Sequence, residues 1–189
     1  QNQVWVGLSR ETAHQLGTPI SSLLAWVEIL KDKNIEGKLI GEMSNDVNRL
    51  RTIAERFSKI GSKPNVEYED LDQILGNAVN YMRNRISQKV KLDYHILSPN
   101  PISLPLNVPL FEWVIENLCK NAIDAMDGYG EINIEVRIQQ ENVLIDVKDN
   151  GKGIPKSKFK TIFNPGYTTK KRGWGLGLSL TKRIVEEYH

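Results

Sequence analysis

The sequence contains a single cysteine, Cys119, among its 189 residues. One cysteine cannot form an internal disulfide, and chains without disulfides are typical of reducing compartments. We therefore expect a buried, unreactive thiol at Cys119 and a cytoplasmic location for the protein.

Long apolar runs are also missing, as is an excess of charge of one sign. No run approaches the roughly 18 apolar residues that cross a bilayer, and no cationic-then-apolar signal peptide is present. The 25 lysines and arginines nearly balance the 23 aspartates and glutamates, so the net charge is only +2. Nucleic-acid binders carry a larger basic excess. We expect a soluble fragment that contacts neither nucleic acid nor membrane, which leaves open whether a parent protein is anchored in the inner membrane.

Hydrophobic residues make up 40% of the chain, enough for an ordinary core in one domain or two small ones. Before residue 61, heptad spacing predicts two helices, over residues 4–30 and 36–60. The first has its apolar seam at Leu16, Ile20, Leu23, Val27 and Leu30, and the second at Leu39, Met43, Val47, Leu50, Phe57 and Ile60. A short connection makes the two helices antiparallel.

A lone pair of such helices would leave half of each seam uncovered. We therefore predict a homodimer that closes a four-helix bundle. Glycine, serine and proline then interrupt the periodicity. The predicted organisation is a helical hairpin over residues 1–61, a linker over 62–65 and a second domain over 66–189.

The second domain mixes strands and helices without strict alternation. Strands are predicted near residues 66–68, 89–96, 102–104, 131–138 and 143–148, and helices over about 70–86 and from Asn107 or Pro109 onward. This order favours an α+β sandwich with helices on one face of a mixed sheet. The predicted fold class is thus an all-α hairpin followed by an α+β domain.

Three short motifs in the second domain point to one ligand. Asn117 and Asn121 stand four apart in a helical pattern, so both amides lie on one flank of the helix. Asp149 ends a β-like run, and Gly151 and Gly153 let the backbone come close to whatever Asp149 contacts. Residues 173–178 are rich in glycine and open a helix whose free N–H groups favour phosphate. A magnesium–nucleotide triphosphate would satisfy all three motifs.

In order and spacing, these motifs resemble the N box and the two glycine boxes of the histidine kinase and gyrase ATPase superfamily. Phe163-Asn164-Pro165 resembles the F box between them. The resemblance implies that the domain binds ATP and Mg²⁺, that Asn121 holds the ion with help from Asn117, and that Asp149 bonds the exocyclic amine of adenine. Nucleotide contacts are further expected at Lys120, Gly151, Gly153, Thr168, Thr169, Gly173, Gly175, Leu176, Gly177 and Leu178.

Two expectations about this domain carry alternatives. Residues 154–172 form a long segment rich in Lys, Thr and Gly, which we interpret as a nucleotide lid, although a solvated basic loop explains it equally well. The chain also begins and ends inside helical patterns, and the family usually adds strands after the last helix. We therefore expect a piece of a longer protein that stops before its closing strands.

His14 lies on the first helix, about 160° from the seam, and should face solvent. His14-Gln15-Leu16-Gly17-Thr18-Pro19-Ile20 resembles the phosphoacceptor box of sensor histidine kinases. Pro19 should bend the helix beside the histidine. The resemblance makes His14 the phosphoacceptor and places Thr18 at the family's phosphatase position. Gln15 departs from the family, which has an acid there, and Glu11 is either a substitute base or a solvated surface carboxylate.

These motifs predict an ATP-dependent protein-histidine kinase that phosphorylates His14 and passes the phosphoryl group to a response-regulator aspartate. One alternative is an ATPase of the gyrase or mismatch-repair type, but those enzymes carry a catalytic glutamate where this chain has Asn117. A pseudokinase scaffold is the other alternative, and Gln15 is its only support. The stimulus, the response regulator and the choice between cis and trans phosphorylation are left open.

Overall fold

The structure is a computed structural model that describes residues 16, 20–33, 37–60, 65–170 and 175–189. The chain divides into two compact units, Gln1–Pro64 and Asn65–His189. No helix in the described ranges combines the length and apolarity needed to cross a membrane.

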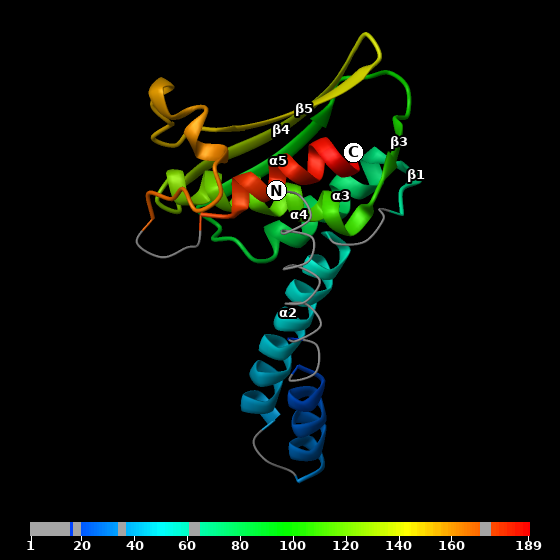
Figure 1. The fold of residues 1–189 in the computed structure, drawn as a ribbon, viewed down its shortest axis with the longest axis vertical. Coiled ribbons are helices and arrows are strands. Elements are labelled where there is room, and N and C mark those ends of the chain that lie inside the picture. Colours follow the sequence, from blue (N-terminus) through cyan, green and yellow to red (C-terminus); the bar gives the residue numbers. More distant parts are fainter. Residues whose placement is uncertain (1–15, 17–19, 34–36, 61–64, 171–174) are drawn as a thin grey trace. The chain divides into compact units, whose positions relative to one another are not determined.

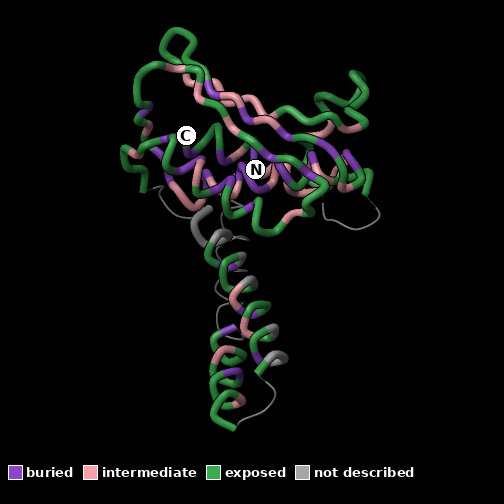
Figure 2. The backbone as a smooth tube through the Cα atoms, turned by 180° about the vertical axis from the view of Figure 1, so that it is seen from behind, coloured by how far each residue is buried: buried purple, intermediate pink, exposed green. Residues whose placement is uncertain are grey.

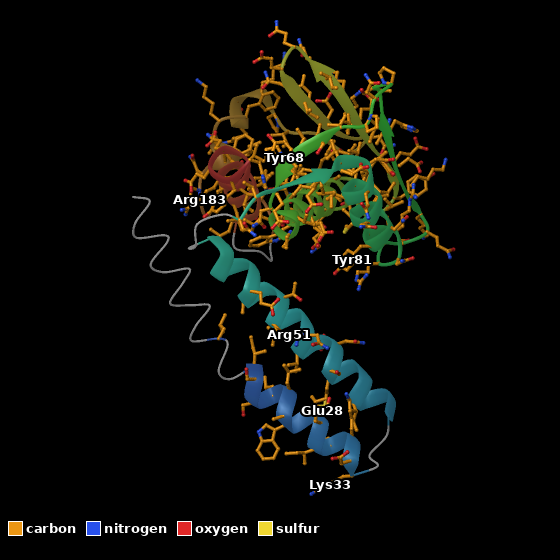
Figure 3. All side chains as sticks on the ribbon, turned by 90° about the vertical axis from the view of Figure 1, so that its right-hand side faces the viewer. Glu28, Lys33, Arg51, Tyr68, Tyr81 and Arg183 are labelled. Atoms are coloured by element: carbon orange, nitrogen blue, oxygen red, sulfur yellow. The ribbon has the colours of Figure 1, made fainter. Side chains whose placement is uncertain are left out.

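The N-terminal unit contains a helix over residues 20–32 and helix α2, Gly37–Ile60. One apolar cluster joins them, formed by residues seven apart on each helix: Ile20 and Val27 on the first, and Ile40, Val47 and Ala54 on α2. The side chains of Glu28 and Arg51 lie exposed on the two helices, and that of Lys33 lies exposed just after the first helix (Figure 3). A heptad row on each helix therefore supplies the contact between them.

Other members of the predicted seams stay exposed. Leu16, Leu23, Met43 and Leu50 are 39–46% exposed, and they form a second row beside the buried one. The predicted seams therefore separate into a row that packs within the chain and a row that remains open on its surface.

The C-terminal unit is an α+β domain, as predicted. Its elements are β1 Glu67–Asp70, α3 Leu71–Arg83, β2 Val90–Ile96, β3 Ser103–Leu106, α4 Val108–Ala125, β4 Gly130–Gln139, β5 Asn142–Asp149, the short 3₁₀ helices η1 Lys156–Lys158 and η2 Thr161–Phe163, and α5 Gly177–Tyr188. The helices α3, α4 and α5 form a layer on one face of the main sheet (Figure 1).

The main sheet has the order β2-β4-β5, with β2 parallel and β5 antiparallel to β4. The main sheet is mixed, as predicted, but it contains three of the predicted strands, because β1 and β3 pair with each other in a separate sheet. Both strands have four residues, and Pro105 in β3 has no N–H to donate to a ladder. A short strand with a proline is poorly suited to join a second neighbour.

Alternation along β4 decides which face carries the core. Ile132, Ile134 and Val136 are almost fully buried, whereas the residues between them are partly or fully exposed. In Figure 2 the buried parts of the C-terminal unit lie along the sheet and the helices, and the β4–β5 turn is exposed. The core therefore lies between the sheet and the layer of α3 and α4.

Cys119 lies in this core with no exposed surface. Burial raises the pKa of its thiol to about 12, and the nearby Glu116 carboxylate adds to the rise. The predicted buried thiol is thus confirmed, and it stays protonated at neutral pH, which makes it a poor nucleophile.

Asn107 starts the helix that carries the paired asparagines. Its side-chain oxygen accepts a hydrogen bond from the Leu110 amide at 3.3 Å, and its Nδ2 donates to the Asn65 carbonyl at 3.0 Å. Pro109 follows within the first turn. Both start signals identified in the sequence therefore act at the beginning of α4.

Two glycines permit close approach of backbone segments around α4 and α5. A Cβ on Gly151 would lie 2.8 Å from the backbone of Ala125, at the end of α4, and the Lys152 amide donates to the Ala125 carbonyl at 3.0 Å. A Cβ on Gly175 would lie 2.5 Å from the Gly166 carbonyl carbon. These contacts hold the turn after β5 against α4 and the start of α5 against residues 166–167.

Gly175→Ala should destabilise the domain more than Gly153→Ala. Both glycines have positive φ, +65° and +70°, so the strain of an alanine is matched, but nothing lies within 4 Å of a Cβ at Gly153. Gly175→Ala should lower the free energy of unfolding by about 1–3 kcal/mol more than Gly153→Ala, which is the usual cost of overpacking. Urea unfolding followed by circular dichroism measures both, and equal losses would contradict the packing described above.

Candidate nucleotide-binding site

Asn117 and Asn121 lie one turn apart on α4 and are partly buried. The Asn117 side-chain oxygen would be 3.9 Å from a Cβ on Gly177, so this amide faces the first residue of α5. Its Nδ2 is buried and has no hydrogen-bond partner in the described part of the chain. Because a buried donor without a partner costs roughly 1–3 kcal/mol, this group is suited to a bound ligand or water.

Asn121 presents its side-chain oxygen to a cation. Oδ1 accepts a hydrogen bond from the Lys170 ammonium at 2.9 Å, and the same ammonium is paired with the Asp124 carboxylate. Hard cations such as Mg²⁺ prefer oxygen ligands, and the ammonium shows that a positive charge fits beside this oxygen. The residues present therefore fit the ion that the paired asparagines suggested.

Register places Asp149 on the same side of the sheet as the helices. It pairs with Ile132, whose side chain is in the core, and cross-strand partners point to the same face. Its Oδ1 accepts from the Gly151 amide at 2.9 Å. Among the described residues no donor occupies Oδ2, so this oxygen can accept a hydrogen bond from a ligand amine.

The N-terminus of α5 has no side-chain cap. Leu176 precedes the helix, and its carbonyl accepts from the Leu180 amide at 2.9 Å and from the Ser179 hydroxyl at 2.9 Å. The amides of Gly177 and Leu178 lie in this first turn, at the positive end of the helix dipole. Such a turn beside Asn117 can bind phosphate groups.

Several predicted contacts are already engaged elsewhere. The Thr168 hydroxyl accepts from the Lys170 amide at 3.1 Å, which closes a local turn. Lys120 is exposed and pairs with Glu116 at 3.6 Å on α4. Thr169 is exposed. These residues carry no direct sign of a ligand contact, so their roles stay predictions.

Other predicted residues lie outside the described ranges. These are His14, Gln15 and Thr18 in the N-terminal unit and Gly173 in the C-terminal unit. Their roles also stay predictions.

Neither Asp124 nor the contact of Lys170 with Asn121 was predicted from the sequence. Asp124 follows Asn121 by three residues, so a helical wheel already places both on one face of α4. Within the described residues no group of three or more His, Cys, Asp or Glu side chains gathers to hold a metal. An ion here would have the Asn121 oxygen, the Asp124 carboxylate and the bound ligand as its ligands.

Comparison with known proteins agrees with this geometry. Residues 107–189 match the family of histidine kinase-, DNA gyrase B-, and HSP90-like ATPases. The chain is 30% identical over 190 residues to sporulation kinase E of Bacillus subtilis, a match that covers 96% of this chain and 25% of that protein. It is 30% identical over 203 residues to sensor protein KdpD of Escherichia coli, covering 98% of this chain and 22% of that protein. The chain thus spans about a quarter of these curated relatives.

Solved structures show the same fold. The nucleotide-free catalytic domain of histidine kinase ThkA matches with a TM-score of 0.59 at 26% identity, over 66% of this chain and 82% of that chain. Full-length ShkA in complex with AMPPNP matches with a TM-score of 0.72 at 17% identity, over 95% of this chain and 40% of that chain. ThkA in complex with response regulator protein TrrA matches with a TM-score of 0.60 at 22% identity, over 97% of this chain and 55% of that chain.

The α4 asparagines, the aspartate at the end of β5 and the uncapped start of α5 thus lie in the segment that the family model matches. Residues 107–189 match the histidine kinase-, DNA gyrase B-, and HSP90-like ATPase family, and the C-terminal unit has the α+β fold of the catalytic domain of histidine kinase ThkA.

Proposed function

We propose that the chain is the kinase core of a sensor histidine kinase, which binds ATP and Mg²⁺ in its C-terminal unit and phosphorylates His14. The observation that carries the proposal is the convergence of motifs on α4. The Asn121 oxygen accepts a hydrogen bond from the Lys170 ammonium, and Asn117 faces the start of α5. The turn after Asp149 is hydrogen bonded to the end of α4.

Each residue then has a physical role toward the nucleotide. Asp149 would accept a hydrogen bond from the adenine amine through the oxygen that Gly151 leaves open. The first turn of α5 would bind phosphate oxygens through its free amides. Asn121, with Asn117, would hold Mg²⁺, which neutralises phosphate charge when bound. Phosphoryl transfer relies mainly on positioning and charge neutralisation, and these groups supply both.

His14 would accept the γ-phosphoryl group and then pass it to an aspartate on a response-regulator receiver domain. Thr18, four residues after His14 in sequence, would orient water when the reaction runs as a phosphatase. The names of the relatives as kinases and sensor proteins, and the ThkA structure with a response regulator, support this part of the proposal.

The two alternatives have less support. A gyrase-type ATPase needs a carboxylate base to activate water, and Asn117 cannot accept a proton in that way. The neighbouring Glu116 is 5% exposed and lies within 3.6 Å of the Lys120 amine, so it is buried and engaged. A pseudokinase scaffold has Gln15 as its only support, since that residue replaces the acid that the family carries after the phosphoacceptor.

Removal of the pocket side chains should strongly weaken nucleotide binding. We expect Asn121→Ala and Asp149→Ala each to weaken binding of an ATP analogue with Mg²⁺ more than about tenfold, since each removes a bond to a charged or polar partner. Calorimetric titration measures the affinity. Asn142→Ala, an exposed position at the far end of β5, is the control and should bind normally. Unchanged affinity in both pocket variants would remove this assignment.

Incubation with γ-labelled ATP and Mg²⁺ tests the kinase activity itself. The wild-type chain should acquire label that is labile to acid and stable to alkali, and His14→Gln should acquire none. Gln15→Glu should raise the labelling rate by at most about 10²–10⁴-fold, the range of general base catalysis. Label that survives His14→Gln would refute the acceptor assignment, and ATP hydrolysis without labelling would favour the ATPase alternative.

The homodimer is part of the same proposal. The exposed row of Leu16, Leu23, Met43 and Leu50 runs beside the buried row at heptad spacing. A second copy that presents the same row would cover it and close a four-helix bundle.

Charges placed in the exposed row should prevent the dimer. Leu23→Asp and Leu50→Asp would each bury an unpaired carboxylate at the interface, which costs several kcal/mol. Light scattering should report a dimer for wild type and a monomer for both variants. Asn45→Asp adds the same charge at an exposed polar position of α2 and should stay dimeric. A monomeric wild type at micromolar concentration would exclude the bundle.

A further inference from the structure

Lys170 bridges two side chains of α4 that lie 46 and 49 residues away in sequence. Its ammonium donates to the Asn121 oxygen at 2.9 Å and pairs with the Asp124 carboxylate. Two oxygens from successive turns of one helix thus converge on a single positive charge. The Thr168 hydroxyl accepts from the Lys170 amide at 3.1 Å, which orders the backbone at the base of this side chain.

The same Asn121 oxygen is the one that the proposed function assigns to the magnesium ion. It cannot contact an ammonium at hydrogen-bond distance and also ligate a divalent ion in the same direction, because the two cations would overlap and repel. Occupation by one cation therefore excludes the other from this oxygen.

We propose that Lys170 is a tethered counter-cation of the ion site, which occupies it in the nucleotide-free domain and leaves when the divalent ion binds. This inference rests on the proposed role of Asn121 as an ion ligand. The ammonium neutralises the Asp124 carboxylate while no metal is present, and its departure releases residues 168–170 from α4. Metal binding is thereby coupled to the position of residues 168–170.

The strength of the contact sets the size of the expected effect. The side chains of Lys170 and Asp124 are 41% and 53% exposed, so solvent screens the pair. Exposed ion pairs contribute about 0.2–1 kcal/mol, and 1.4 kcal/mol is a factor of ten in affinity, so replacement of Lys170 should change binding by up to about fivefold. An effect of this size is measurable by titration.

The test compares the dissociation constant of AMPPNP without metal, in EDTA, with the constant in saturating Mg²⁺. In wild type, Lys170 partly replaces the missing ion in EDTA and competes with the ion when Mg²⁺ is present. Lys170→Met removes both effects. The dissociation constant in EDTA divided by the constant in Mg²⁺ should therefore increase about two- to fivefold. NMR titration measures both constants, since it reaches millimolar affinities. Circular dichroism checks that the variant is folded.

Lys158→Met is the matched control. It removes the same charge from an exposed lysine on η1 and should leave the ratio unchanged. An unchanged or smaller ratio in Lys170→Met, or an equal increase in Lys158→Met, would overturn the inference. A wild-type protein that binds AMPPNP in neither condition would instead refute the proposed nucleotide site, so the two failures are distinguishable.

Discussion

The contact between the turn after β5 and the end of α4 is the constraint on which the site depends. Gly151 lies so close to Ala125 that no side chain fits between them, and the Lys152 amide bonds to the same residue. This contact ties the strand that ends in Asp149 to the helix that carries the asparagines. Without this contact, the distance between Asp149 on the sheet and the asparagines on α4 would not be fixed, and a rigid ligand could not bind both.

Charge is arranged around α4 so that one side suits cations and the other suits anions. Asn121 and Asp124 present oxygens on successive turns, and Lys170 fills the position between them. Asn117 lies toward the uncapped start of α5, whose amides favour phosphate oxygens. A magnesium–triphosphate group has this same polarity, with the ion on one side of its phosphates. In the proposal above, Lys170 is the internal substitute for the ion.

In the N-terminal unit one heptad pattern serves two purposes. Ile20, Val27 and Val47 lie in the row buried between the two helices, while Leu23 and Leu50 lie in the neighbouring row and stay exposed. A stripe wider than one helix contact is what a four-helix bundle requires, because each helix must pack against two neighbours. The open row therefore has a structural reason within the dimer proposal.

Much of the fold and the core of the site followed from the sequence alone, because the signals are local. Asn107 and Pro109 mark the start of α4, and helical spacing puts Asn117 and Asn121 on one flank. The β-like run before Asp149 predicted β5, and Asp149 ends this strand as expected. Neighbours within about one helical turn or one strand determine each of these features.

Only the tertiary structure decided the pairing of β1 with β3 and the contact of Lys170 with Asn121 and Asp124. Tyr68 pairs with Pro105, and Lys170 is 49 residues from Asn121, so both depend on how distant segments meet. Periodicity and turn signals do not predict contacts between distant segments, because the energy of such contacts comes from the packing of the whole domain rather than from any one segment. The sequence by itself thus determined which chemical groups the candidate site contains. The tertiary structure decided that Asn121 and Asp124 both contact the Lys170 ammonium, because the distance between remote residues is defined only once the chain has folded.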